Sequence, residues 1–183
     1  MKLRLRKVWI GCLALLFLVG LACTGADAAQ QQGAGNTVNI DNATKAVAVL
    51  HPTVGHKAYG VIIFDQEANG VLVVADLGGL SPGVHTVQIH EYGDCSNLDA
   101  ASAGKIFNPK TKQKSPNGKV VKHPPVGELG QIDADSSGHA RLEMVDPLFS
   151  VGGPGTIIGR SVVVETGSGG PRTACGVIGI ATK

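Results

Sequence analysis

Residues 83–95 (GVHTVQIHEYGDC) carry the side chains best suited to binding chemistry. If this stretch is a β-strand, alternation places Gln88 and His90 on one face and Val87 and Ile89 on the other. An imidazole and an amide two residues apart could together bind a ligand on the outer face of a sheet. We expect them to be hydrogen-bonding surface residues, with ligand or metal binding as the alternative.

Cysteines are the second group of reactive side chains. The chain has four, of which Cys95 directly follows the segment just described and Cys175 lies near the C-terminal end. The other two lie within the first 23 residues. In an oxidising compartment the later two suggest one disulfide, and two free buried thiols are the alternative.

Short β-rich runs separated by turn signals must position these residues. Gly70, Gly83 and Gly138 close three of the turn segments. The runs fall at residues 45–50, 59–65, 71–77, 85–91, 128–133, 139–145, 157–165 and 174–180. Short strands at this spacing predict an all-β fold, either a sandwich or an eight-stranded Greek-key β-barrel.

One connection is much longer than the others. About 36 residues without a strand pattern separate Glu91 from Glu128. A loop of this length in a compact domain is either functional or a sign of a wrong assignment. Cys95 stands at its start and Cys175 in the last predicted strand, so a bridge between them would pin the loop to the barrel wall. We therefore expect an ordered loop.

The first 28 residues have the pattern of an export signal. Four basic residues precede an apolar run from Val8 to Ala22, and Ala26-Asp27-Ala28 offers a small-x-small cleavage site. The run is about 15 residues long, whereas a membrane span needs about 20, and no second apolar segment follows. We expect a signal peptide at 1–28, a flexible tether at 29–41, a folded domain at 42–183 and no transmembrane span in the mature chain.

Lipidation is a second way in which the signal segment could be processed. Residues 20–23 (GLAC) resemble a bacterial lipobox, although such boxes usually carry Leu where Gly20 stands. Cleavage after Ala28 is the first expectation, lipidation of Cys23 the second, and an uncleaved anchor the third. The predicted location is the bacterial periplasm or cell envelope, with a membrane-anchored lipoprotein as the variant.

Composition argues against several classes of partner. Of the 16 basic and 14 acidic residues, four bases and one acid precede residue 29, so the remaining chain has a net charge near −1. This near-neutral domain gives no electrostatic reason to bind a polyanion. Aromatic residues make up 4% of the chain, which offers few stacking platforms, and we expect no nucleic-acid binding.

Blocks of sequence spread over nearly the whole mature domain occur in a fixed order. They are 43–47 (ATKAV), 90–95 (HEYGDC), 102–104 (SAG), 107–109 (FNP), 126–130 (VGELG), 157–160 (IIGR) and 174–181 (ACGVIGIA). Together they resemble the copper/zinc superoxide dismutases of the exported bacterial type. The resemblance implies a Greek-key barrel, a disulfide between Cys95 and Cys175, and that the long loop is the family's zinc loop.

The resemblance also implies copper ligands at positions that carry other residues here. The two histidines of the family's strand motif fall on Gln88 and His90, so only the second is present. The metal-bridging histidine falls on Ile106, and the last copper histidine falls on Glu165.

The zinc-ligand positions implied by the resemblance also carry other residues in this chain. The two loop histidines of the family fall near Lys114 and Pro125, with His123 as a displaced candidate. The zinc aspartate falls on Glu128, which keeps a carboxylate at that position.

These replacements determine what chemistry we expect. Dismutation needs a metal that cycles between Cu(I) and Cu(II), and an amide, an alkyl group and a carboxylate cannot replace three imidazoles that suit both states. His90 with Gln88, Glu165 or Glu128 would hold Zn²⁺ or Cu²⁺ weakly, with fewer protein ligands than a tight site uses. We expect no tightly bound cofactor, and copper or zinc is the alternative.

The anion-attracting arginine of the family falls on Arg172. The segment before it, 166–171 (TGSGGP), is shorter than the family's loop of guiding charges. Glu165 beside Arg172 would largely cancel its field, and an ion pair at a site rim adds only about 0 to 1 kcal/mol to stability.

The resulting prediction is an exported superoxide dismutase-like protein with a degenerate copper/zinc site, a non-catalytic binding or structural protein of the cell envelope. The first alternative is an active copper-dependent superoxide dismutase that converts superoxide to oxygen and hydrogen peroxide, recruiting His90 with His123 or His85. The second is a periplasmic metal-handling protein that uses His90, Gln88, Glu165 and Glu128. The sequence identifies no partner and leaves a homodimer open.

Overall fold

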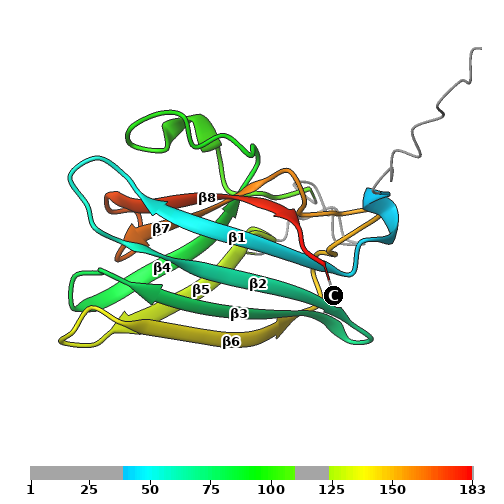
Figure 1. The fold of residues 1–183 in the computed structure, drawn as a ribbon, viewed down its shortest axis with the longest axis horizontal. Helices are drawn as coiled ribbons and strands as arrows, with labels where there is room; N and C mark the ends of the chain where they lie inside the picture. Colours follow the sequence, from blue (N-terminus) through cyan, green and yellow to red (C-terminus); the bar gives the residue numbers. More distant parts are fainter. Residues whose placement is uncertain (1–38, 110–123, 183) are drawn as a thin grey trace, which may run out of the picture. The chain divides into compact units, whose positions relative to one another are not determined.

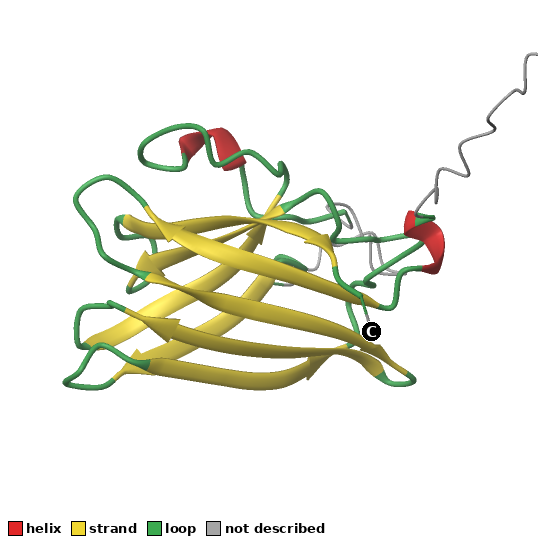
Figure 2. Ribbon diagram, viewed as in Figure 1, coloured by secondary structure: helices red, strands yellow, loops and turns green. Residues whose placement is uncertain are grey.

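The computed structural model describes residues 39–109 and 124–182. Its strands are β1 Lys45–Pro52, β2 Tyr59–Glu67, β3 Gly70–Gly78, β4 Gly83–His90, β5 Glu128–Ala134, β6 Ala140–Asp146, β7 Ser161–Thr166 and β8 Arg172–Ile180. Two short 3₁₀ helices, η1 Ile40–Asn42 and η2 Ala101–Ala103, accompany them. The described segments contain no α-helix, which confirms the all-β prediction (Figure 2).

The strands form one sheet in the order β5-β4-β7-β8-β1-β2-β3-β6, and every neighbouring pair is antiparallel. In Figure 1 the strands β1, β2, β3 and β6 form the near wall, and β4, β5 and β7 lie behind it. The chain crosses between the walls from β3 to β4, from β5 to β6 and from β6 to β7, which makes the connectivity a Greek key. Within the described residues no ladder joins β5 to β6, so the barrel is nearly closed.

Alternate residues of the near-wall strands point into the core. Ala46, Ala48 and Leu50 of β1 are buried, and so are Ile62 and Phe64 of β2. This period-2 pattern is expected of strands with one face against a core. The ring of Phe64 lies edge-on to that of Phe149, with centroids 6.4 Å apart.

Seven of the predicted strands agree with the observed ones to within about two residues at each end, a spread usual for strand ends. The eighth was wrong at its start: the run 157–165 was predicted as a strand, but β7 begins at Ser161. A turn precedes it, in which Arg160 N–H donates to the carbonyl of Ile157 at 3.1 Å. Gly159 adopts φ +79° there, a conformation that favours glycine.

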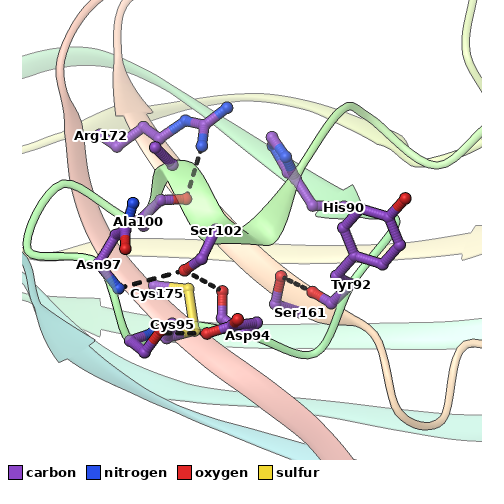
Figure 3. Close-up of a disulfide and its surroundings, with 12 residues drawn as sticks. His90, Tyr92, Asp94, Cys95, Asn97, Ala100, Ser102, Ser161, Arg172 and Cys175 are labelled. Carbon is purple, nitrogen blue, oxygen red and sulfur yellow. Dashed lines mark hydrogen bonds between the residues drawn. A yellow bond between two sulfur atoms is a disulfide. The ribbon is translucent and has the colours of Figure 1, made fainter.

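The long connection starts as the ordered loop that was predicted. Cys95 and Cys175 form a disulfide that joins this loop to β8, which confirms the pairing (Figure 3). The hydroxyl of Ser102 donates to the carbonyl of Asp94 at 2.9 Å and accepts from the N–H of Asn97 at 3.2 Å. The Ser102 hydroxyl therefore ties both ends of residues 94–102 together, and the disulfide fastens this segment to β8.

Several predictions fall outside the described residues. They concern the signal peptide 1–28, most of the tether 29–41, Cys23, Lys114 and His123. Where the structure describes the chain, no helix has the length and apolar character to cross a membrane.

Candidate functional site

A cavity of about 650 Å³ opens where the ends of β4 and β7 and the start of β8 meet the segment after η2. Seven residues singled out from the sequence line it: Gln88, His90, Ile106, Pro125, Glu128, Glu165 and Arg172. The fold thus brings together positions that are up to 84 residues apart in the chain. His123 is outside the described residues.

Gln88 and His90 point away from the core residues Val87 and Ile89, as alternation predicted. The expectation that they are surface residues was wrong, because they are only 5% and 1% exposed. The segment after η2 covers them: His90 forms an isolated antiparallel bridge with Ile106. Strand alternation gives the face of a residue, but it does not show that a distant loop covers that face.

Both ring nitrogens of His90 have partners. Nδ1 lies 2.9 Å from the carbonyl oxygen of Gly104, and Nε2 lies 3.4 Å from Oε1 of Gln88. A carbonyl oxygen only accepts, so Nδ1 carries the hydrogen. Burial lowers the pKa of His90, against the opposing effect of the Gly104 hydrogen bond, and the charge of Arg172 lowers it further. The imidazole is therefore neutral at neutral pH.

Gln88 covers the remaining lone pair of that imidazole. With the hydrogen on Nδ1, Nε2 is an acceptor, and the isosteric amide of Gln88 satisfies it when its NH₂ group takes the facing position. In that orientation of the amide, the second imidazole nitrogen is hydrogen-bonded to a side chain of the same strand.

Glu165 and Arg172 face each other because a tight turn joins β7 to β8. Thr166 N–H donates to the carbonyl of Pro171 at 2.9 Å, and a Cβ on Gly170 would lie 2.0 Å from the carbonyl oxygen of Thr166. The ladder shifts register just before Glu165, and residues at such irregularities are often re-aimed. The two residues are paired across the hairpin, and Oε1 of Glu165 lies 3.5 Å from Nε of Arg172.

All three guanidinium nitrogens of Arg172 are engaged. Besides Nε, Nη1 donates to the carbonyl of Ala100 at 2.6 Å and Nη2 to that of Gly104 at 3.3 Å. Figure 3 shows the side chain reaching over the loop that contains η2. Arg172 therefore spans from the β7–β8 hairpin to the disulfide-linked loop.

The other lining residues contribute unequally. Glu128 is exposed and forms no ion pair within the described segments. Ile106 is half-buried and offers no donor atom. The two therefore give the cavity a solvated carboxylate and an apolar wall.

The sequence prediction missed the carbonyl groups of Ala100 and Gly104, which are the main acceptors at this site. A pattern of side-chain types does not report backbone acceptors. The glycine of the 102–104 block was the available signal, because Gly104 has φ +79°, in the region that favours glycine.

His85 lies on the other face of β4 and is fully buried. Its Nε2 lies 2.8 Å from the carbonyl oxygen of Ser81, so it ties the strand to the preceding turn. His85 does not line the cavity, so it does not share a site with His90.

The donor set does not fit a redox copper ion or a structural zinc ion. Tight transition-metal sites use three or four protein ligands, whereas the described residues of this cavity offer one imidazole, an amide and carboxylates, one of them held by an arginine. Across residues 39–109 and 124–182, no group of three or more His, Cys, Asp or Glu side chains is placed to hold a metal.

Comparison with known proteins gives one consistent result. Residues 58–178 match the family model described as copper/zinc superoxide dismutase (SODC). This match covers more than half of the chain.

Two curated relatives agree with that match. The chain is 36% identical over 158 residues to a superoxide dismutase [Cu-Zn] of Onchocerca volvulus, covering 75% of this chain and 96% of that protein. It is 35% identical over 160 residues to an extracellular superoxide dismutase [Cu-Zn] of Brugia pahangi, covering 77% of this chain and 78% of that protein.

Proposed function

Because this chain belongs to the copper/zinc superoxide dismutase family, we propose that it is an exported member that keeps the barrel as a scaffold and has lost copper-dependent dismutation. Its role is that of a non-catalytic binding or structural protein of the cell envelope. The observation that carries the proposal is the donor set of the cavity, in which His90 is the one imidazole among residues 39–109 and 124–182.

Redox chemistry explains why this donor set would not support dismutation. Copper lowers the barrier to dismutation only if its ligands stabilise both oxidation states, and neutral imidazoles do so. At the places where the resemblance implies copper histidines, this chain has the amide of Gln88, the alkyl group of Ile106 and the carboxylate of Glu165. An alkyl group has no lone pair, and the carboxylate is already paired with Arg172.

Export is the second part of the proposal. The basic and apolar segments before Ala28 support it, and the word extracellular in the name of the Brugia pahangi relative agrees with it. The bacterial envelope is inferred from the form of residues 1–28, with cleavage after Ala28 or lipidation of Cys23 as the two routes.

One metal-loading experiment tests the proposal. The purified full chain is loaded with copper and zinc, dialysed, and measured for bound metal and for the rate of superoxide decay. The Onchocerca volvulus protein, treated in parallel, is the positive control. We expect less than one tenth of a copper per chain and no acceleration of superoxide decay.

The other outcomes are equally informative. Stoichiometric copper with rapid decay of superoxide would show an active dismutase and overturn the proposal. Retained metal without decay would show a metal-handling protein and overturn the scaffold role.

A further inference from the structure

Glu165 and Arg172 form an unusually enclosed ion pair for this chain. Their side chains are 11% and 24% exposed, whereas those of Arg141 and Glu143 in the pair on β6 are 70% and 63% exposed. The β6 pair is also longer, at 3.8 Å against 3.5 Å. Screening by water weakens an exposed pair far more than an enclosed one.

The enclosed pair continues into the disulfide-linked loop. The same guanidinium donates to the carbonyls of Ala100 and Gly104, and Gly104 also accepts from Nδ1 of His90. Arginine suits this arrangement because its donors have a fixed planar geometry, so holding one edge fixes the direction of the others. The carboxylate at Nε therefore determines where the other two nitrogens point.

We infer that Glu165 is a positioning residue: its carboxylate aims Arg172 at the loop carbonyls and cancels the guanidinium charge, so that the cavity holds its shape without an ion and does not attract anions. This inference rests on the proposed function, because a tightly bound metal would compete for Glu165 and His90. It adds a specific role for the acid, which the family assignment does not give.

The arrangement fastens the loop to β8 at two separate places. The disulfide does so at Cys95 and Cys175, and the guanidinium of Arg172 does so at Ala100 and Gly104. The two fastenings are chemically independent, because one is covalent and the other is a set of charge-assisted hydrogen bonds. Loss of Glu165 should therefore loosen residues 100–104 while the disulfide keeps Cys95 in place.

The first test is a double-substitution cycle in EDTA-treated, metal-free full chain. Glu165→Gln, Arg172→Gln and the double variant are compared by urea unfolding and by amide hydrogen exchange. We expect each single substitution to make the amides of Ala103 and Gly104 exchange at least tenfold faster, and the double variant to exchange no faster than the singles. The matched control is the same cycle on Arg141 and Glu143, where we expect additive effects below twofold.

Arg172→Lys separates direction from charge. Lysine keeps the positive charge but has no fork of donors, so we expect exchange at Gly104 as fast as in Arg172→Gln. Protection equal to the parent's would show that charge alone is sufficient and would overturn the positioning role. This variant keeps the charge balance of the pair and remains informative if Glu165→Gln does not fold.

A gain of binding is the second readout. Without the carboxylate, the guanidinium charge at the cavity is uncompensated, so Glu165→Gln should bind inorganic phosphate at least threefold more tightly than the parent. NMR titration of backbone amides 100–104 measures this, and Glu143→Gln is the control with no expected change. Equal phosphate binding together with unchanged exchange would overturn the inference.

These results are separable from the proposed function. Tight copper binding by the parent chain would overturn the proposed function, and it is measured on metal-loaded protein. The cycle and the phosphate titration use metal-free protein, so their failure would remove the role of Glu165 and leave the loss of dismutation standing.

Discussion

His90 and Arg172 donate to the same oxygen atom, the carbonyl of Gly104, from distances of 2.9 Å and 3.3 Å. One side chain comes from the end of β4 and the other from the start of β8, so a single backbone group joins two strands that are not neighbours in the sheet. A carbonyl oxygen has two lone pairs and accepts both bonds. The cavity is thus organised around a backbone acceptor.

Restoring imidazoles should restore copper binding. We expect the combined substitution Gln88→His, Ile106→His and Glu165→His to raise copper affinity at least a hundredfold over the parent, because it supplies four imidazoles around one cavity. Competition against a chromophoric copper chelator measures the change.

The control for this prediction adds histidines elsewhere. Gln131→His, Asp133→His and Glu143→His together place three imidazoles at exposed strand positions. We expect a gain below tenfold from this variant. If both triple variants gained equally, the cavity would not be the place where the strand ends converge.

The pH dependence of stability should carry a contribution from His90. Its pKa is lowered in the folded chain by burial, so the unfolded chain binds a proton on this imidazole more readily. The folded state therefore loses stability as the pH falls through about 6.5, the ordinary pKa of histidine, and the contribution is constant well above that pH.

The measurement is urea unfolding of the parent and of His90→Gln at about pH 7.5 and about pH 5.5. We expect the loss of unfolding free energy between the two pH values to be smaller in the variant. An equal loss in both proteins would show that other groups account for the acid sensitivity.

Asp146 should oppose stability at neutral pH. Asp146 is 5% exposed, and this burial raises the pKa of its carboxyl group. The hydrogen bond from Leu148 N–H, at 2.7 Å, only partly offsets that rise. No cation pairs with it within the described residues. A carboxyl whose folded pKa is raised binds its proton more tightly when folded, so its contribution to stability falls as the pH rises through that range.

Asp146→Asn should therefore raise the free energy of unfolding at about pH 7, because the amide keeps an acceptor for Leu148 and buries no charge. The gain should shrink as the pH falls toward about 4, the ordinary pKa of an aspartate, because the parent is protonated in its folded state before that pH is reached. Asp133→Asn, at an exposed position, is the control and should change little.

Loss of the disulfide should lower the free energy of unfolding more than any other change proposed here. Cys95 and Cys175 are 80 residues apart in sequence, and closing a loop of that length restricts the unfolded chain by about 4 to 5 kcal/mol. We expect the Cys95→Ser, Cys175→Ser double variant to lose stability of that order in urea unfolding. A loss below about 1 kcal/mol would show that the loop is held mainly by its hydrogen bonds.

The sequence predicted the barrel because the information is local. Alternating apolar residues such as Ala46, Ala48 and Leu50 specify a strand and its buried face without reference to the rest of the chain. The prediction of where β7 starts was wrong for the same reason. Residues 157–160 have the composition of a strand, and only Gly159 indicated the turn.

The sequence predicted which side chains form the site, but it did not predict their burial or their hydrogen bonds. Gln88, His90, Glu165 and Arg172 were all identified, and the Glu165–Arg172 pair was anticipated from their place beside a short segment. Burial of Gln88 and His90 depends on a loop that returns from farther along the chain, and the roles of Ala100 and Gly104 depend on backbone geometry. Apart from the glycine at position 104, residue type gave no signal for either feature.

The turn between β7 and β8 makes the protein a receptive host for grafted segments. A Cβ on Gly167 or Gly169 would meet nothing within 4 Å, so the turn has open space around it, although both glycines lie at positive φ, at 63° and 75°, where other residues are strained. Ser168 and Gly169 line the cavity mouth. A peptide spliced in at this point would hang over the opening while the ladders on either side kept their pairing, so new recognition elements could be installed there as on an antibody framework.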